Sequence, residues 1–372
     1  MPDESEVRAA AEAVIDPVLR RPIGALGMVA EVATEGARPV VTLADPLERE
    51  REPLVTAVAD AVDGEVDVAV RDMTEAESKA TAAILRGDTL DPLTVVDAGA
   101  AEQQHRERVN PFIDTRTRVL AIASGKGGVG KSSVTTNLAI ALAQRGHRVA
   151  AVDADVWGFS MPRMLGIEHP PSLVDELIIP PESNGVRLIS MGFFAREDQP
   201  VVWRGPMLHK ALEQFLTDVY WDEPDYLVVD MPPGTGDVAL SMAQFLPRAE
   251  FVIVTTPQLA AQRVAQRAAY MAKRVNLELL GVIENMSWFR GDDGTSYDIF
   301  GSGGGDQLAR LLEVPLLGQV PLVPALREGG DAGNPIVVQA PDDEASIAFR
   351  EIATRVDELA PKKIHHPELK IV

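Results

Sequence analysis

The sequence contains no cysteine. No disulfide, thiolate zinc site or cysteine-ligated iron–sulfur cluster can therefore form from the residues of this chain alone. Long apolar runs are missing as well, since none approaches the roughly 18 residues that a membrane-spanning helix requires. The first residues, Met-Pro-Asp-Glu-Ser-Glu, include neither the basic nor the apolar region of a secretion signal. We therefore expect a soluble, cytoplasmic protein.

Lysine is scarce, and negative charge outweighs positive charge. Only 8 of the 35 basic residues are lysines, and the 56 acidic residues give the chain a net charge of −21. Such a surface repels nucleic acid and anionic membranes at long range. We therefore expect no nucleic acid and no membrane among the partners of this protein.

The most informative stretch is glycine-rich: residues 124–133 read Ser-Gly-Lys-Gly-Gly-Val-Gly-Lys-Ser-Ser. It satisfies the phosphate-loop template G-x-x-x-x-G-K-[ST], between an apolar strand pattern (118–123) and a helical pattern (132–144). Backbone amides and the positive end of a helix dipole would surround a polyphosphate there. The residues predicted to contact the nucleotide are Gly125, Lys126, Gly127, Gly128, Val129, Gly130, Lys131, Ser132 and Ser133.

Two of these side chains have specific predicted roles. Lys131 would reach the β- and γ-phosphates as part of the catalytic machinery, and the Ser132 hydroxyl would bind Mg²⁺. The alternative is a glycine-rich turn without a ligand, which the flanking strand and helix patterns disfavour.

Acidic residues follow two apolar strand patterns where a phosphate-loop enzyme needs them. Asp153 and Asp155 end one pattern, and Asp230 ends another before a glycine turn. In doubly wound folds ligands bind at this carboxyl edge of the sheet. We predict that Asp155 orients or deprotonates the attacking water, that Asp153 lies near Mg²⁺, and that Asp230 holds Mg²⁺ through water. The backbone N–H of Gly234 would contact the γ-phosphate. Ordinary strand-end turn acids are the alternative.

Two further features have weaker signals. Asn285 ends another apolar strand pattern, where its amide could pair with an adenine edge or simply form a turn. The run Gly301–Gly305 could be a second phosphate cradle, although a flexible loop is the favoured interpretation.

The chain divides into segments by its pattern. Residues 1–72 predict a small α/β domain, 73–116 a linker with some helix, 117–360 an ATPase domain with a doubly wound, mostly parallel α/β sheet, and 361–372 a tail. Within the first segment we expect a helix over 4–15, a hairpin of 26–32 and 39–43, a helix over 48–62 and a strand over 64–71.

The second lysine of the loop narrows the class. With Lys126, the pattern K-G-G-x-G-K-[ST] resembles the deviant Walker A motif of the MinD and ParA ATPases. The resemblance implies that Lys126 reaches across a homodimer to the partner's ATP, so that hydrolysis depends on dimerisation. An incidental surface lysine is the alternative.

Seven motifs in order resemble the Mrp-like (ApbC-type) iron–sulfur cluster carrier P-loop ATPases. They are SGKGGVGKS, DADVWGFSMP, DYLVVDMPPGTGD, VTTPQ, GVIENMSWF, FGSGGG and PALREGGDAGNPIVV, over roughly 117–357. The N-terminal segment, with Asp16-Pro17 and Asp45-Pro46, is similar to the small iron–sulfur assembly domain often fused ahead of such ATPases. The resemblance implies ATP, Mg²⁺ and a [4Fe–4S] cluster bridging two protomers.

The sequence departs from that pattern at the cluster ligands. Family members usually carry C-x-x-C just after E-N-M-S, where this chain has Trp-Phe-Arg-Gly-Asp-Asp-Gly over 288–294. Asp292 and Asp293 could bind a hard cation, but a solvated turn is the favoured interpretation. An acidic residue usual after V-T-T-P-Q is here Gln262, and His365-His366 does not replace a thiolate set. The [4Fe–4S] cluster is therefore doubtful.

Three hypotheses remain. The chain is a slow, dimer-dependent ATPase that serves as an iron–sulfur carrier or assembly factor, working with client or assembly proteins that supply the cysteines. Alternatively, it is a dimeric nucleotide-dependent switch or scaffold that has lost cluster binding. A MinD- or ParA-like positioning ATPase is disfavoured, because it requires a basic DNA-binding face or a membrane helix.

Overall fold

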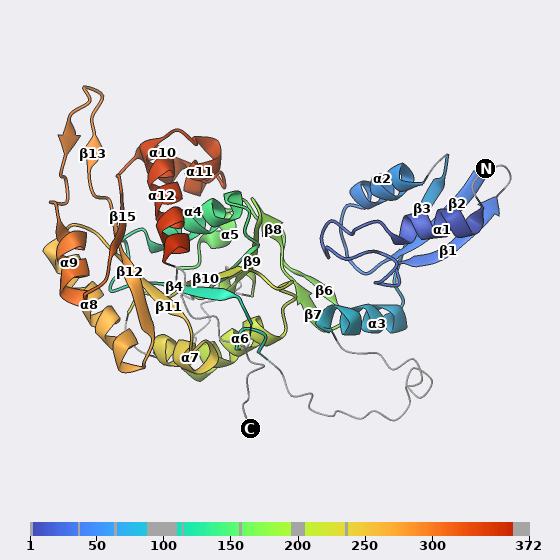
Figure 1. Ribbon diagram of the computed structural model, residues 1–372, viewed down its shortest axis with the longest axis horizontal. Helices are drawn as coiled ribbons and strands as arrows, with labels where there is room; N and C mark the ends of the chain where they lie inside the picture. The colour runs from blue at the N-terminus through green and yellow to red at the C-terminus, as the bar shows by residue number, and fades with distance from the viewer. Residues whose placement is uncertain are drawn as a thin grey trace. The chain divides into compact units, whose positions relative to one another are not determined.

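The computed structural model describes residues 3–35, 38–62, 65–87, 110–113, 115–155, 158–194, 205–234 and 237–359 (Figure 1). Most of the predicted linker, the predicted tail and His365-His366 lie outside the described residues. The chain forms two compact units. The small unit consists of Met1–Glu107, Ser172–Ile179 and Asp218–Asp222, and the large unit of the remaining segments.

The small unit is built on a three-stranded sheet in the order β1-β2-β3. β1 and β2 are antiparallel and β3 is parallel to β2. The predicted order of helix, hairpin, helix and strand is confirmed. The two helices and the last strand are shorter than predicted, the first hairpin strand is shifted along the chain, and the second is longer. The elements are α1 (Glu4–Glu12), β1 (Val29–Glu35), β2 (Arg38–Asp45), α2 (Glu52–Ala61) and β3 (Asp67–Asp72), followed by α3 (Glu75–Arg86) from the segment predicted as a linker with some helix.

Two segments from later in the sequence complete the core of the small unit. The hairpin of β6 (Ser172–Val174) and β7 (Leu177–Ile179) contributes three buried side chains, and Tyr220 contributes a fourth. The Tyr220 hydroxyl donates a hydrogen bond of 3.0 Å to the Leu19 carbonyl. These contacts could not be predicted from the sequence, because local patterns do not reveal contacts across some 200 residues.

The large unit contains an eight-stranded sheet in the order β15-β12-β11-β4-β10-β5-β9-β8, parallel except for the β8–β9 pair. The predicted doubly wound, mostly parallel α/β fold is confirmed. The strands are β4 (Arg118–Ser124), β5 (Val149–Asp153), β8 (Glu182–Ser183), β9 (Val186–Ser190), β10 (Tyr226–Asp230), β11 (Glu250–Thr255), β12 (Glu278–Asn285) and β15 (Leu316–Val320).

Helices cover this sheet on both faces, with α4 and α12 on one side and α7 and α8 on the other (Figure 1). The central strands are therefore buried along their whole length, as continuous apolar sequences in parallel sheets require. The helices are α4 (Lys131–Gln144), α5 (Met161–Met164), α6 (Gly205–Thr217), α7 (Asp237–Phe245), α8 (Leu259–Arg274), α9 (Gly304–Leu312), α10 (Pro324–Asp331), α11 (Ile336–Gln339) and α12 (Glu344–Glu358). No helix in the described ranges is long and apolar enough to cross a bilayer.

Candidate nucleotide-binding site

The glycine loop joins β4 to α4 at the carboxyl edge of the sheet. Gly128 and Gly130 have φ of +78° and +76°, a left-handed conformation that favours glycine. A Cβ on Gly125 would overlap the α8 backbone. Gly130 occupies the N-cap of α4 and has no side chain to cap the first amides. The helix N-terminus is therefore open to an anion, as a phosphate loop requires.

Asn285 lies at the end of β12 beside this loop. Its Nδ2 donates a 2.9 Å hydrogen bond to the Val129 carbonyl, which fixes the loop backbone. Its Oδ1 and the Thr256 Oγ1 are the two buried side-chain polar atoms that lack a hydrogen-bond partner within the described part of the chain. Buried polar atoms are seldom left unpaired, so Asn285 Oδ1, beside the loop, is a candidate acceptor for a ligand. The contact of Asn285 with adenine stays a prediction.

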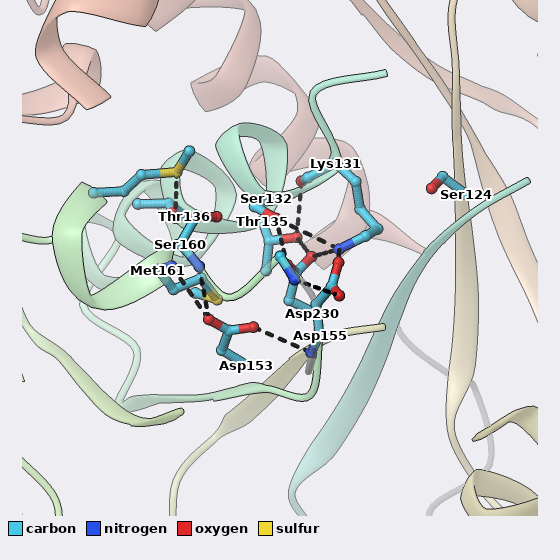
Figure 2. Close-up of polar contacts among 12 residues, drawn as sticks. Ser124, Lys131, Ser132, Thr135, Thr136, Asp153, Asp155, Ser160, Met161 and Asp230 are labelled. Carbon is cyan, nitrogen blue, oxygen red and sulfur yellow. Dashed lines mark hydrogen bonds and ion pairs between the residues drawn. The ribbon is translucent and has the colours of Figure 1, made fainter. Parts of the chain in front are cut away.

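A group of polar side chains surrounds Asp230, the last residue of β10 (Figure 2). Lys131 Nζ lies 2.7 Å from Asp230 Oδ1 and 3.9 Å from Asp155 Oδ2. Ser132 donates to Asp230 Oδ2 at 2.6 Å, and Thr135 donates to Oδ1 at 2.7 Å. The structure therefore brings five side chains together, and Thr135 is the one among them that was not predicted from the sequence.

Asp153 lies opposite Asp230 in the β5–β10 register but faces α5. Burial and the charge of Asp230 raise its pKa to about 7, despite the hydrogen bonds that it accepts. Those donors are Asp155 N (3.2 Å), Ser160 N (3.2 Å), Met161 N (3.2 Å) and Ser190 Oγ (3.0 Å). In this geometry Asp153 shapes the loop after β5, and its predicted place near Mg²⁺ stays a prediction.

This arrangement suits a divalent cation held together with a ligand. Two buried carboxylates, Asp153 and Asp230, lie on adjacent strands, and Lys131 pairs closely with the second of them only. No group of three His, Asp or Glu side chains that could hold a metal ion by itself occurs among the described residues. Mg²⁺ is commonly bound by one or two protein groups plus substrate phosphates, so the residues present fit it.

Two predicted contacts have other partners in this structure. The Gly234 amide donates a 3.3 Å hydrogen bond to the Ser124 carbonyl, so a contact with a γ-phosphate requires that bond to open. Lys126 Nζ lies 3.5 Å from Gln258 Oε1 at the start of α8. Lys126 is half-buried there, and its action across a dimer stays a prediction.

The glycine run before α9 is occupied by the protein itself. The Gly305 amide donates to the buried Glu284 carboxylate, whose other oxygen accepts a 2.7 Å hydrogen bond from Gln319 Nε2. A Cβ on Gly304 would overlap the Gln262 amide. Because Glu284 caps this helix, the geometry disfavours the second phosphate cradle.

The segment that replaces C-x-x-C is a hairpin of β13 (Phe289–Arg290) and β14 (Ser296–Tyr297). Trp288 Nε1 and the Arg290 guanidinium both donate to Glu344 at the start of α12. Asp293 accepts from the Thr295 amide and hydroxyl at 2.9 and 2.8 Å, which lowers its pKa. The turn satisfies its own carboxylate, and the chain has no thiolate, so a [4Fe–4S] cluster does not fit this position.

Thr135 was not predicted from the sequence. It lies three residues after Ser132 on α4, and residues at that spacing share one helix face. Once Ser132 was assigned to the metal, this spacing was the signal that could have identified Thr135.

Comparisons with known proteins agree on the family. The profile described as ParA, NUBPL iron-transfer P-loop NTPase, matches residues 115–357. A Mycobacterium tuberculosis protein named iron-sulfur cluster carrier protein is 46% identical over 363 residues, 93% of this chain and 91% of the relative. A Bacillus subtilis protein of the same name is 41% identical over 320 residues, 86% of this chain and 88% of the relative.

Solved structures support the same fold. The nucleotide-binding protein of Archaeoglobus fulgidus in complex with ADP has a TM-score of 0.54 at 33% identity, over 62% of this chain and 91% of that one. The septum site-determining protein MinD of Pyrococcus horikoshii, complexed with Mg-ADP, has a TM-score of 0.50 at 26% identity, over 67% and 100%. The resemblance noted in the sequence is thus confirmed, and the chain belongs to the ParA/NUBPL family of iron-transfer P-loop NTPases.

Proposed function

We propose that this protein is a slow, Mg²⁺-dependent ATP hydrolase that acts as a cytoplasmic homodimer in iron–sulfur cluster assembly or delivery. One observation carries the proposal: Lys131, Ser132 and Asp230 converge on one point beside a helix N-terminus that is open to an anion. The names of the relatives support an iron–sulfur cargo.

Each side chain has a role in this proposal. Lys131 leaves Asp230 to bind the β- and γ-phosphates, and Asp155 orients the attacking water and accepts its proton. Ser132 and Asp230 hold Mg²⁺, which supplies charge neutralisation on the phosphates. Asn285 and the loop amides fix the base and the phosphate chain.

Dimerisation completes the site in this proposal. Lys126 supplies positive charge to the partner's transferring phosphoryl group, as an arginine finger does in other enzymes. Within one chain, Lys126 makes a long contact of 3.5 Å with the neutral Gln258 side chain. Because this contact is weak, Lys126 can exchange it for the partner's nucleotide when the dimer forms.

The test is calorimetric titration with ATP and Mg²⁺, together with a turnover assay. Lys131→Ala removes the charge that pairs with the phosphates and should abolish tight ATP binding and hydrolysis. Lys79→Ala, on the exposed surface of α3, is a matched control and should leave both unchanged. Unchanged ATP affinity in Lys131→Ala would contradict the proposal.

The hairpin at 289–297 favours a second candidate, a nucleotide-dependent switch or scaffold that binds no cluster itself. The hairpin is anchored by Glu344 and closed by Asp293 without any metal. Anaerobic reconstitution of the isolated protein with iron and sulfide, followed by desalting, separates the candidates. Retained iron with visible charge-transfer absorption would show that the chain holds its own cargo, whereas a clean negative with intact ATPase activity favours the switch.

A further inference from the structure

Asp230 is held by three donors that all come from α4. Lys131 and Thr135 contact its Oδ1 at 2.7 Å each, and Ser132 contacts its Oδ2 at 2.6 Å. The carboxylate is fully buried, so its orientation depends on these contacts rather than on water. Hydrogen bonds to a buried charged group are among the stronger ones in proteins.

In the function proposed above, two of the three donors change partners when a nucleotide binds. Lys131 would move to the phosphates, and the Ser132 oxygen would be shared with Mg²⁺. Thr135 has no place in either contact. Its side chain is fully buried one helical turn further along α4, on the Asp230 side.

The surroundings of Thr135 restrict its hydroxyl to one useful direction. Thr135 Oγ1 lies 2.9 Å from the Lys131 carbonyl, the usual local partner of a threonine in a helix, and 2.7 Å from Asp230. The carbonyl and the carboxylate can both only accept, so they compete for the one hydroxyl proton, and the shorter contact with the charged Asp230 oxygen is the stronger. A β-branched side chain in a helix has few rotamers, which keeps the oxygen in place.

We propose that Thr135 is the positioning residue that keeps Asp230 oriented for the metal when Lys131 is drawn away to the nucleotide. This inference rests on the proposed function, because it concerns the same Mg²⁺–nucleotide site. Thr135 touches neither the metal nor the substrate and acts through Asp230 alone. Its removal therefore weakens metal binding more than it weakens nucleotide binding.

The experiment compares Thr135→Val, which keeps the shape and removes the hydroxyl, with Thr135→Ser, which restores the hydroxyl. Mn²⁺ binding to the full chain loaded with ADP is followed by electron paramagnetic resonance. ADP affinity in EDTA and the thermal midpoint are measured on the same samples. For Thr135→Val we expect about tenfold weaker Mn²⁺ binding, the scale of one lost hydrogen bond to a charged group. ADP affinity in EDTA should be unchanged, and Thr135→Ser should restore Mn²⁺ binding.

Three outcomes would overturn the inference. Mn²⁺ affinity in Thr135→Val equal to that of the wild type would show that Asp230 needs no such support. Equal losses of Mn²⁺ binding and of ADP binding in EDTA would show that Thr135 is a packing residue only. Failure of the wild-type chain to bind Mn²⁺ and ADP at all would overturn the proposed function, and this inference with it.

Discussion

Each of the two units buries a pair of aspartates beside one basic side chain. The pairs differ in whether that side chain contacts both carboxylates or only one of them. In the small unit, Arg49 reaches Asp16 Oδ1 at 3.0 Å and both oxygens of Asp45 at 2.9 and 3.0 Å. In the large unit, Lys131 pairs with Asp230 at 2.7 Å, and Asp153 relies on neutral N–H and O–H donors.

The chemistry of the cations explains the difference. A guanidinium presents five donors in a rigid fork and can satisfy two carboxylates at once, whereas an ammonium is a compact charge on a flexible stem. The small-unit pair is therefore locked, joining the two Asp-Pro turns at Asp16 and Asp45. In the large-unit pair, burial of Asp153 and, after it, the charge of Asp230 raise the pKa of Asp153 to about 7. One arrangement is suited to stability, and the other to receiving a cation and releasing its lysine.

The largest expected effect is on stability and comes from removing Arg49, the cation of the small-unit pair. Arg49→Ala would leave Asp16 and Asp45 as buried carboxylates without their cation, which costs about 3–5 kcal/mol in the free energy of unfolding. Urea unfolding of the full chain measures the loss. ADP affinity should be unchanged, because the carboxylates that Arg49 holds, Asp16 and Asp45, belong to the small unit. A loss below about 1 kcal/mol would mean that this pair is not the locked structural element described.

The second prediction concerns the positive charge that, in the proposed function, Lys126 supplies to the partner's nucleotide. Lys126→Ala should lower turnover by about 100-fold, the usual cost of removing one donor that stabilises transition-state charge. ATP affinity should change much less, because a cation supplied in trans acts mainly on the transition state. Turnover and calorimetric affinity are compared with those of the Lys79→Ala control.

The dependence of this effect on the dimer is also testable. Turnover per subunit should rise with protein concentration in the wild type. A protein that stays monomeric with ATP and hydrolyses it at a rate independent of concentration would contradict the role given to Lys126.

A third prediction uses the raised pKa of Asp153. An unfolded aspartate has a pKa of about 3.9, so between about pH 4 and 7 the folded protein holds a proton that the unfolded chain has lost. This group therefore makes the folded state less stable as pH rises through that window. A bound dication should favour the ionised carboxylate and expel the proton.

The measurement is calorimetric binding of preformed Mg–ADP in two buffers of different ionisation enthalpy. Up to about one proton per site should be released at pH 6, and almost none at pH 8.5, well above the folded pKa. Asp153→Asn should abolish the difference between the two pH values. Release of no proton at pH 6 would show that the repulsion between Asp153 and Asp230 is already relieved without the metal.

The smallest effect is expected where an ion pair is exposed. Glu344 and Arg290 are 41% and 48% exposed, so solvent screens their attraction. Glu344→Gln should lower the free energy of unfolding by less than about 1 kcal/mol, as measured in urea. A loss as large as that of Arg49→Ala would make the hairpin anchor a second locked cluster rather than a surface contact.

Much of the nucleotide site could be predicted from the sequence, because local patterns determine it. Gly125–Gly130 form the expected turn between β4 and α4. Parallel strands end at one edge of a sheet, so the sequence could place Asp153 and Asp230 at the same edge as that turn, whereas the order β4-β10-β5 came from the structure.

Other features depend on contacts that no local pattern encodes. The orientation of Asp153 toward α5 follows from donors at Ser160 and Ser190, which lie on different elements. The hairpin at 172–179 completes the small-unit core through packing with residues far earlier in the chain. The capping of α9 by Glu284 likewise required the fold to be known.

The central claim is that Asp230 and its neighbours form a site for a nucleotide together with a divalent cation. Calorimetric titration of the wild type with ADP, once in Mg²⁺ and once in EDTA, tests it most directly when repeated with Asp230→Asn. The account predicts that Mg²⁺ tightens ADP binding in the wild type and has little effect in Asp230→Asn. An equal gain from Mg²⁺ in both proteins, or none in the wild type, would contradict it.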